Sequence, residues 1–245
     1  MTLLSDKRIL EFIGWEKIVI DPFNEKNLGN CSYDVTLGEF FYLEKNHDGL
    51  GFHNPYSKES VQSMWAGPYT AKKLSFLKQD DEKFRNYITD LGRHSGFAVT
   101  DRLLESIVNN KFENVNEDDK IIFLFPGQNM LGHTIEYIGG VERITTKMLS
   151  RSSMGRNNVT VCRDAGKGDV GYINRWTMEI TNNNKHQVVP LIVGRRIAQI
   201  EFYDVGIANK DYSIAGHYQM SSDLEDLKKN WKTELMLPQL WNSLT

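Results

Sequence analysis

Residues 151 to 182 read RSSMGRNNVTVCRDAGKGDVGYINRWTMEITN, and the RWTMEI segment within them predicts a β-strand with two unlike faces. Successive side chains of a strand point to opposite sides, so Trp176, Met178 and Ile180 are expected to face an apolar core. A carboxylate would then lie on a regular polar surface and not on a loose loop. That polar face carries the residues in between: Arg175, Thr177 and Glu179.

The residues before this strand supply groups that suit a polyphosphate. The RSSMGR turn offers hydroxyls, backbone N–H groups and two guanidinium groups, and a Gly-rich acidic loop around Asp169 follows it. A lone glutamate on a strand is usually an ordinary solvent-facing residue. Its place downstream of this turn and loop favours a second interpretation, in which Glu179 is a general base in an enzyme that acts on a nucleotide.

The remaining pattern predicts a mainly β protein, either a barrel or a distorted jelly roll, because short apolar segments alternate with turns. The expected strands are IIFLF, MLGHTIEYI, ITTKML, NVTVC, RWTMEI, QVVPLIV and IAQIEFY between residues 121 and 205, and a further one at 33–43. Expected helices span 6–13, with Ser5 as the cap, and 80–92, 100–110 and 224–229, whereas 54–67 is expected to be a loop.

Composition narrows the class of protein. A chain of 245 residues can bury a substantial core as one domain, and its net charge of −3 argues against a nucleic-acid-binding protein that works by bulk charge. The two cysteines, Cys31 and Cys162, give no disulfide framework, which favours a reducing compartment, so we expect a cytoplasmic protein. No apolar run has transmembrane length, so we expect no membrane partner.

Several motifs, in order, resemble those of the dCTP deaminases, the deaminating branch of the trimeric dUTPase superfamily. The central stretch is similar to the family's RSSxxR turn, its alanine, its ID-x-G-aromatic loop and its T-L-E strand. The resemblance covers about residues 3–50 and 118–222. Its other parts are LSDKRI at 4–9, IDPF at 20–23, CSYDVTLG at 31–38, FPG at 125–127, VGRRIAQI at 193–200, Tyr212, and GHYQ at 216–219.

The resemblance implies a dUTPase-like (β-clip) domain over 1–222, with a helical insertion at about 50–117 and a C-terminal helical extension at 223–245. It implies that Ser152 and Arg156 orient the attacking water and the cytosine, and that the carbonyl of Ala165 contacts the reacting group. Glu179 is the implied catalytic acid–base. The implied substrate contacts are Arg151, Ser153, Met154, Gly155, Asp169, Tyr172, Thr177, Met178, Tyr212, His217 and Gln219.

The expected reaction is hydrolytic deamination of dCTP to dUTP and ammonia, a step in pyrimidine deoxynucleotide metabolism. One carboxyl group can move the protons if burial raises its pKa toward working pH. The H-x-E and P-C-x-x-C signature of zinc deaminases is absent from the sequence. We therefore expect no zinc, with Mg²⁺ only as the counter-ion of the nucleotide.

Two alternatives stay open. The chain is either a dUTP diphosphatase or a bifunctional enzyme that converts dCTP to dUMP and diphosphate, since Asp169 resembles the water-activating aspartate of dUTPases. Alternatively it is a non-catalytic nucleotide-binding regulator on the same fold. The resemblance also implies a homotrimer with active sites between subunits, and dUTP and dTTP as further ligands.

Overall fold

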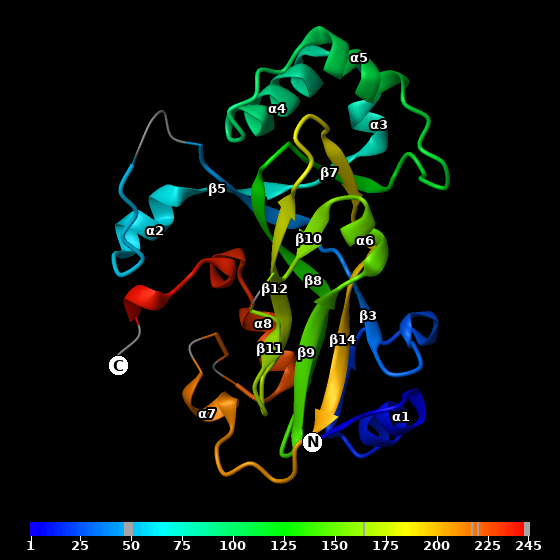
Figure 1. Cartoon of the computed structure of the whole chain (residues 1–245), viewed down its shortest axis with the longest axis vertical. Helices are drawn as coiled ribbons and strands as arrows, with labels where there is room; N and C mark the ends of the chain where they lie inside the picture. The colour runs from blue at the N-terminus through cyan, green and yellow to red at the C-terminus, as the bar shows by residue number, and fades with distance from the viewer. Residues whose placement is uncertain (47–50, 164, 217, 220, 243–245) are drawn as a thin grey trace.

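Antiparallel sheets make up most of the protein in the computed structural model, which describes residues 1–46, 51–163, 165–216, 218–219 and 221–242 (Figure 1). In the first sheet the long strand β14 pairs with β1, β3 and β9, and every residue of β9 is paired with β14. The strands of this sheet are β1 (Thr2–Leu3), β3 (Tyr33–Thr36), β9 (Ile144–Ser150), β11 (Lys167–Gly168) and β14 (Arg196–Asp204).

The second sheet carries the strand singled out by the sequence. Its centre is the pair β8 and β12, in register from Ile173 opposite Gly139 to Thr181 opposite Asn129, with an irregularity between Arg175 and Thr177. The strands of this sheet are β2 (Ile18–Asp21), β4 (Phe40–Glu44), β5 (Trp65–Thr70), β8 (Asn129–Gly140), β10 (Val159–Val161) and β12 (Ile173–Asn182).

A small third sheet and the helices complete the fold. The strands of the third sheet are β6 (Lys72–Lys73), β7 (Lys120–Leu124) and β13 (Val189–Ile192). The α-helices are α1 (Asp6–Gly14), α2 (Lys58–Met64), α3 (Leu74–Leu77), α4 (Glu82–Arg93), α5 (Asp101–Asn109), α6 (Ser152–Arg156), α7 (Tyr212–Ala215) and α8 (Leu224–Asn230). Short 3₁₀ turns are η1 (Glu25–Asn27), η2 (Thr233–Met236) and η3 (Leu240–Asn242).

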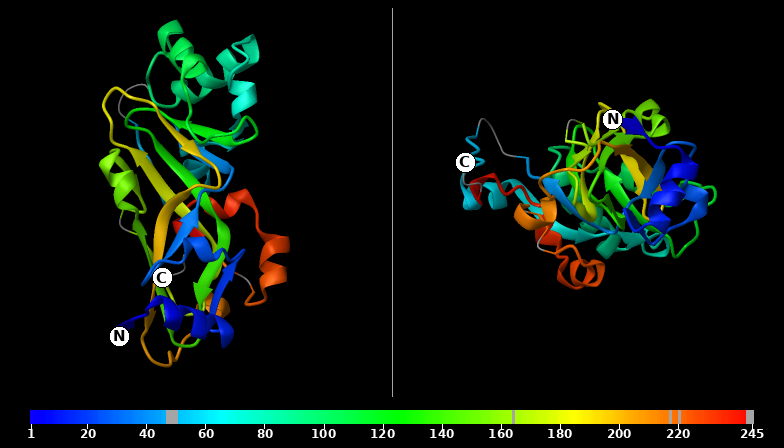
Figure 2. Two further views of the ribbon diagram at one scale, coloured as in Figure 1. Left: turned by 90° about the vertical axis from the view of Figure 1, so that its right-hand side faces the viewer. Right: turned by 90° about the horizontal axis from the view of Figure 1, so that it is seen from below.

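The helices occupy the two ends and one side of the elongated sheet body. Helices α3, α4 and α5 lie together at one end, and α1 lies at the other (Figures 1 and 2). Helix α1 begins where the sequence predicts, because the Ser5 side chain accepts a hydrogen bond from the N–H of Arg8. Both predicted helices near 80–110 are confirmed as α4 and α5, and the one at 224–229 is confirmed as α8.

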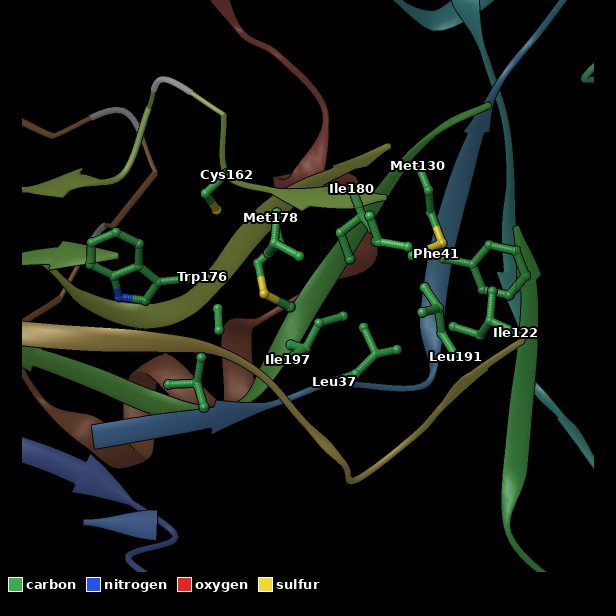
Figure 3. Close-up of a cluster of buried hydrophobic side chains, with 14 of the residues drawn as sticks. Leu37, Phe41, Ile122, Met130, Cys162, Trp176, Met178, Ile180, Leu191 and Ile197 are labelled. Atoms are coloured by element: carbon green, nitrogen blue, oxygen red, sulfur yellow. The ribbon is translucent and has the colours of Figure 1, made fainter. Parts of the chain in front are cut away.

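The main core lies between the first two sheets and follows the alternation of β12. Trp176, Met178 and Ile180 are at most 4% exposed and point among side chains from β8 and β14, as the period-two pattern predicts (Figure 3). Cys162 lies beside Trp176 and Met178 in this group, and Leu37 and Ile197 contribute from the facing side. This packing fixes the orientation of β12, and therefore fixes its opposite face as well.

The stretch from 54 to 67 is not a loop, which corrects the sequence-based expectation. Ser57 caps helix α2, whose Val61 is buried, and β5 then pairs with β4. The expected strand at 33–43 is divided into β3 and β4. The region from 51 to 117 is likewise not purely helical, since β5 and β6 join strands of the sheets. The pairing partners that create β5 and β6 lie far from them in sequence, so local pattern does not reveal them.

The C-terminal segment packs on the same chain, along β8 and β4. Met236 is 4% exposed and contacts Tyr42 and Leu131, with Trp231 and Leu237 beside them. Burial of a methionine side chain stabilises a fold by ~2 kcal/mol.

No helix among the described residues is long and apolar enough to cross a membrane.

Candidate active site

A cavity of about 740 Å³ opens over the polar face of β12. Arg175, Thr177, Glu179 and Thr181, which alternate along that face, all line it. The loop before β12 adds Ala165, Asp169 and Tyr172, and the tail adds Tyr212. The alternation of β12 thus places apolar side chains on the face toward the core and the candidate functional side chains on the face toward the cavity.

Glu179 is the carboxyl group in the middle of this face. Surrounding protein atoms desolvate it, and this raises the pKa of Glu179 above its ordinary value, although the side chain stays open to the cavity. A hydrogen bond from Cys162 opposes the shift, but desolvation is the larger effect. The direction agrees with the expectation for a catalytic carboxyl, because a raised pKa brings the group closer to neutral pH.

Asp169 and Tyr172 lie on the loop that leads into β12. Asp169 is exposed and forms an ion pair with Lys167 at 2.9 Å. The ring of Tyr172 meets those of Trp176 and Tyr212 edge-on, with centroids 5.3 and 5.2 Å apart. Burial raises the pKa of Tyr172, so the phenol stays neutral. A flat apolar wall next to a carboxylate suits a sugar or a base.

Gly171 joins this loop to the tail. Its φ is +93°, and a Cβ there would lie 2.0 Å from Oδ1 of Asp211, so a larger residue would force the two segments apart. The N–H of Tyr212 also donates to the carbonyl of Val170 at 2.9 Å. Tyr212 is thereby held against the cavity, as expected for a residue of the tail.

Gln219, which the sequence predicts as a substrate contact, makes hydrogen bonds to the protein itself. The side chain is 3% exposed, donates to the carbonyl of Gly171 at 2.9 Å and accepts from the N–H of Ile173 at 2.7 Å. Asn174 donates to the carbonyl of Tyr218 at 2.8 Å in the same place. Both amides fasten the tail to β12. The expected contact of His217 lies outside the described residues.

The side chain of Met178 is completely buried in the core, as the alternation predicts, so the expected substrate contact at Met178 would have to use its backbone. This follows from the alternation itself, since Met178 lies between Thr177 and Glu179. Thr177 is half-buried and lines the cavity. Ala165 lines it too, on the exposed loop before β11.

The RSSMGR residues do not join Glu179 within one chain. They form α6, with Arg151 as the preceding cap residue, and none of them is among the described residues that line the cavity. Arg151 lies 3.5 Å from Asp34, and Ser152, Ser153, Gly155 and Arg156 are exposed. Met154 packs against the core. The exposed groups are free to face another molecule.

Sequence reasoning missed several cavity residues. The residues that line the cavity but belong to no motif are Arg163, Asn129, Glu44, Trp231 and Met236, and Tyr218 lies in the GHYQ motif but was given no role. Arg175 was assigned to the polar face without a role, and the alternation was the signal that could have found it. The aromatic residues of the C-terminal segment carry no local signal, because only the three-dimensional fold brings them to β12.

The described residues contain no group of three or more His, Cys, Asp or Glu side chains placed to hold a metal ion. The cavity is instead formed by one desolvated carboxyl group, arginine side chains and aromatic walls. Such a lining defines a polar small-molecule site on a β scaffold.

Comparison with known proteins agrees with this picture. A family model described as dCTP deaminase-like matches residues 86–205. A protein of Methanocaldococcus jannaschii named "dCTP deaminase, dUMP-forming" is 30% identical over 200 residues, covering 82% of this chain and 81% of the relative. One of the same name from Methanococcus maripaludis strain C7 is 29% identical over 239 residues, covering 95% and 98%. The chain therefore belongs to the dCTP deaminase family.

Among solved structures, the chain is similar to the 2'-deoxycytidine 5'-triphosphate deaminase of Agrobacterium tumefaciens. That likeness has a TM-score of 0.47 at 14% identity and covers 81% of this chain and 47% of the other. The assignment to the family rests on the sequence relatives, and the fold rests on the strand pairings.

Proposed function

We propose that the protein deaminates dCTP with Glu179 as the general acid–base. The observation that carries this proposal is the position of Glu179, whose carboxyl group lies on the polar face of β12 inside the cavity with a raised pKa. The names of the family members, which specify dCTP deamination, support the choice of substrate.

The proposed chemistry needs one carboxyl group that moves two protons. Ionised Glu179 takes a proton from water as the oxygen bonds to C4 of the cytosine, and passes that proton to ring N3. It then takes the remaining hydroxyl proton and gives it to the amino group, so that the C4–N bond breaks and ammonia leaves. The net change is dCTP plus water to dUTP plus ammonia. No metal takes part at the base, and Mg²⁺ accompanies the triphosphate.

We further propose that the product is dUMP, so that the chain is of the bifunctional kind. The relatives are named dUMP-forming, which favours this alternative over release of dUTP. Asp169 lines the same cavity and is exposed, so it is positioned to activate a second water for attack at the α-phosphate. That step would release diphosphate and leave dUMP.

We also propose a homotrimer in which α6 of one subunit completes the cavity of the next. The support is the separation of RSSMGR from Glu179 within a chain, together with the exposure of Ser152 and Arg156. In this arrangement the hydroxyl and guanidinium groups of α6 reach the substrate across the subunit interface, as closed cyclic symmetry allows.

One product analysis tests these proposals together. The protein is incubated with dCTP and Mg²⁺, and ammonia, dUTP, dUMP and diphosphate are resolved over time. Ammonia with dUMP and diphosphate supports the bifunctional enzyme, and ammonia with dUTP supports a deaminase alone. Bound but unchanged dCTP would point to a non-catalytic regulator and overturn the proposal.

A further inference from the structure

Arg175 lies on the same face of β12 as Glu179, four residues away, or about 13 Å along the strand. Its guanidinium lies close to two aromatic rings. The carbon Cζ is 5.2 Å from the centre of the Tyr137 ring and 4.8 Å from that of Trp231. Contact with the flat side of the guanidinium leaves the terminal N–H donors at its edge to bind other groups.

The positive charge of Arg175 has no carboxylate partner among the described residues. Its Nε is buried and makes no hydrogen bond there. The nearby carboxylate of Glu136 is engaged by Thr36, whose N–H and hydroxyl donate to it at 3.0 and 2.7 Å. An arginine kept beside a cavity without an ion-pair partner is costly unless an anion or water meets it.

The charged neighbours of Arg175 act on it only at longer range. Burial raises the pKa of Glu136, and the charge of Arg175 opposes that rise, but no ion pair joins the two. His133 packs against Trp231 with ring centroids 4.8 Å apart, and burial lowers the pKa of His133 to about 4, so the imidazole is neutral at physiological pH. The cavity thus has the Glu179 carboxyl group at one position on β12 and, at another, a cation that forms no ion pair with the described residues.

Trp231 comes from the C-terminal segment and is held firmly in place. Its N–H donates to the carbonyl of Leu227 at 3.0 Å, and its ring also contacts Phe40, with centroids 6.3 Å apart. Leu235, Met236 and Pro238 of the same segment line the cavity. The segment therefore forms one wall of the cavity and restricts the guanidinium to a single orientation, which lowers the entropy lost on binding an anion.

We propose that Arg175, clamped by Trp231, is an anion subsite that binds the phosphate chain of the nucleotide. The inference rests on the proposed function and deepens it, because it fixes the direction of the substrate along β12. The base lies at Glu179, the phosphates lie toward Arg175, and Thr177 lies between them. The C-terminal segment is then part of the substrate site. Arg163 also lines the cavity, but its side chain is exposed, whereas Nε of Arg175 is buried.

The test compares charged and uncharged ligands on full-length protein. In a Glu179→Gln background, which blocks turnover, dCTP and deoxycytidine are titrated calorimetrically against proteins with and without Arg175→Met. We expect dCTP affinity to fall about ten- to a hundred-fold, as for loss of a charge-assisted hydrogen bond, while deoxycytidine affinity changes less than about two-fold. The matched control, Arg102→Met on α5, removes the same charge from an exposed position away from the cavity and should change dCTP affinity by less than about two-fold.

A merely structural role for Arg175 predicts a different result. Equal losses for dCTP and deoxycytidine, or no loss for dCTP, would overturn the proposal. If Arg175→Met fails to fold, Arg175→Lys keeps a charge but not the planar donors, and a selective loss for dCTP is still expected. Failure of the proposed function is seen separately, as an absence of ammonia release from dCTP by the unaltered protein.

Discussion

The backbone N–H of Cys162 donates to the carbonyl of Glu179 at 2.9 Å, which places the Cys162 side chain beside the carboxyl group on β12. Cys162 adopts a left-handed backbone with φ of +51°, and burial raises the pKa of its thiol, so the thiol keeps its proton. The thiol donates to Sδ of Met148 at 3.1 Å, and it also lies close enough to Glu179 to lower the pKa of that carboxyl group. Desolvation, which raises the pKa of Glu179, is thus opposed by a hydrogen bond from its own backbone and by the Cys162 side chain, and the effects of desolvation and of Cys162 can be tested.

Replacement of Glu179 by glutamine should abolish ammonia release and keep nucleotide binding. Loss of a general acid–base typically lowers turnover about 10²–10⁴-fold, whereas the amide keeps the shape of the side chain. The measurements are kcat from ammonia release and Kd for dCTP. Glu105→Gln on α5, an exposed control, should behave as the unaltered protein. Near-normal turnover by Glu179→Gln would show that another group is the base.

The pH dependence should follow the raised pKa of Glu179. The ionised carboxylate starts the reaction, so kcat/KM falls as pH drops through that pKa, at a higher pH than for an ordinary glutamate. Cys162→Ala removes a hydrogen bond that lowers the pKa of Glu179, so its acid limb should move to still higher pH. Cys162→Ser keeps a donor and should move the limb less. Superimposable profiles would contradict this account.

The stability of the protein should also depend on pH through Glu179, and the raised pKa fixes the direction of that dependence. Because folding raises the pKa of Glu179, its favourable contribution is fully present below the unfolded pKa and is lost as pH rises through the folded pKa. Glutamine resembles the protonated form, so Glu179→Gln should melt at a higher temperature than the unaltered protein at pH 8. The difference should shrink toward pH 4. A constant difference across this range would argue against desolvation as the cause.

Asp169→Asn should separate the two proposed reactions. The substitution removes a carboxylate that faces the cavity from the loop but leaves Glu179 in place. We expect ammonia release to continue while dUTP accumulates and dUMP formation falls about 10²-fold or more. Chromatography of the nucleotide products gives the result. Unchanged dUMP formation would exclude Asp169 as the activating group, and loss of both reactions would show that Asp169 mainly binds the sugar.

Mixed subunits test the proposed trimer. Glu179→Gln and Arg156→Met should each be inactive, because one lacks the base and the other lacks a guanidinium on α6. Unfolding and refolding the two together should restore about a quarter of the unaltered activity per site, since some interfaces then combine two intact surfaces. Light scattering checks the oligomeric state. Mixtures without activity, despite proven exchange of subunits, would place the complete site within one chain.

Local pattern was enough to predict β12, because its alternation directly reflects burial: Trp176, Met178 and Ile180 are core residues and Glu179 faces the cavity. Periodicity also predicted α4 and α5. It failed where a distant partner decides the structure, as for β5 on β4. Trp231 reaches the cavity only through the path of the whole chain, so no spacing in the sequence could indicate its pairing with Arg175.

The two faces of β12 also bear on how such a protein can change over time. Trp176, Met178 and Ile180 share the backbone of β12 with Glu179. Substitutions that repack these core residues to raise thermal stability should therefore also shift the Glu179 carboxyl group and lower turnover. Proteins of this kind that adapt to a new temperature should therefore vary at positions outside β12. Stabilising substitutions in laboratory evolution are likewise best sought outside this strand.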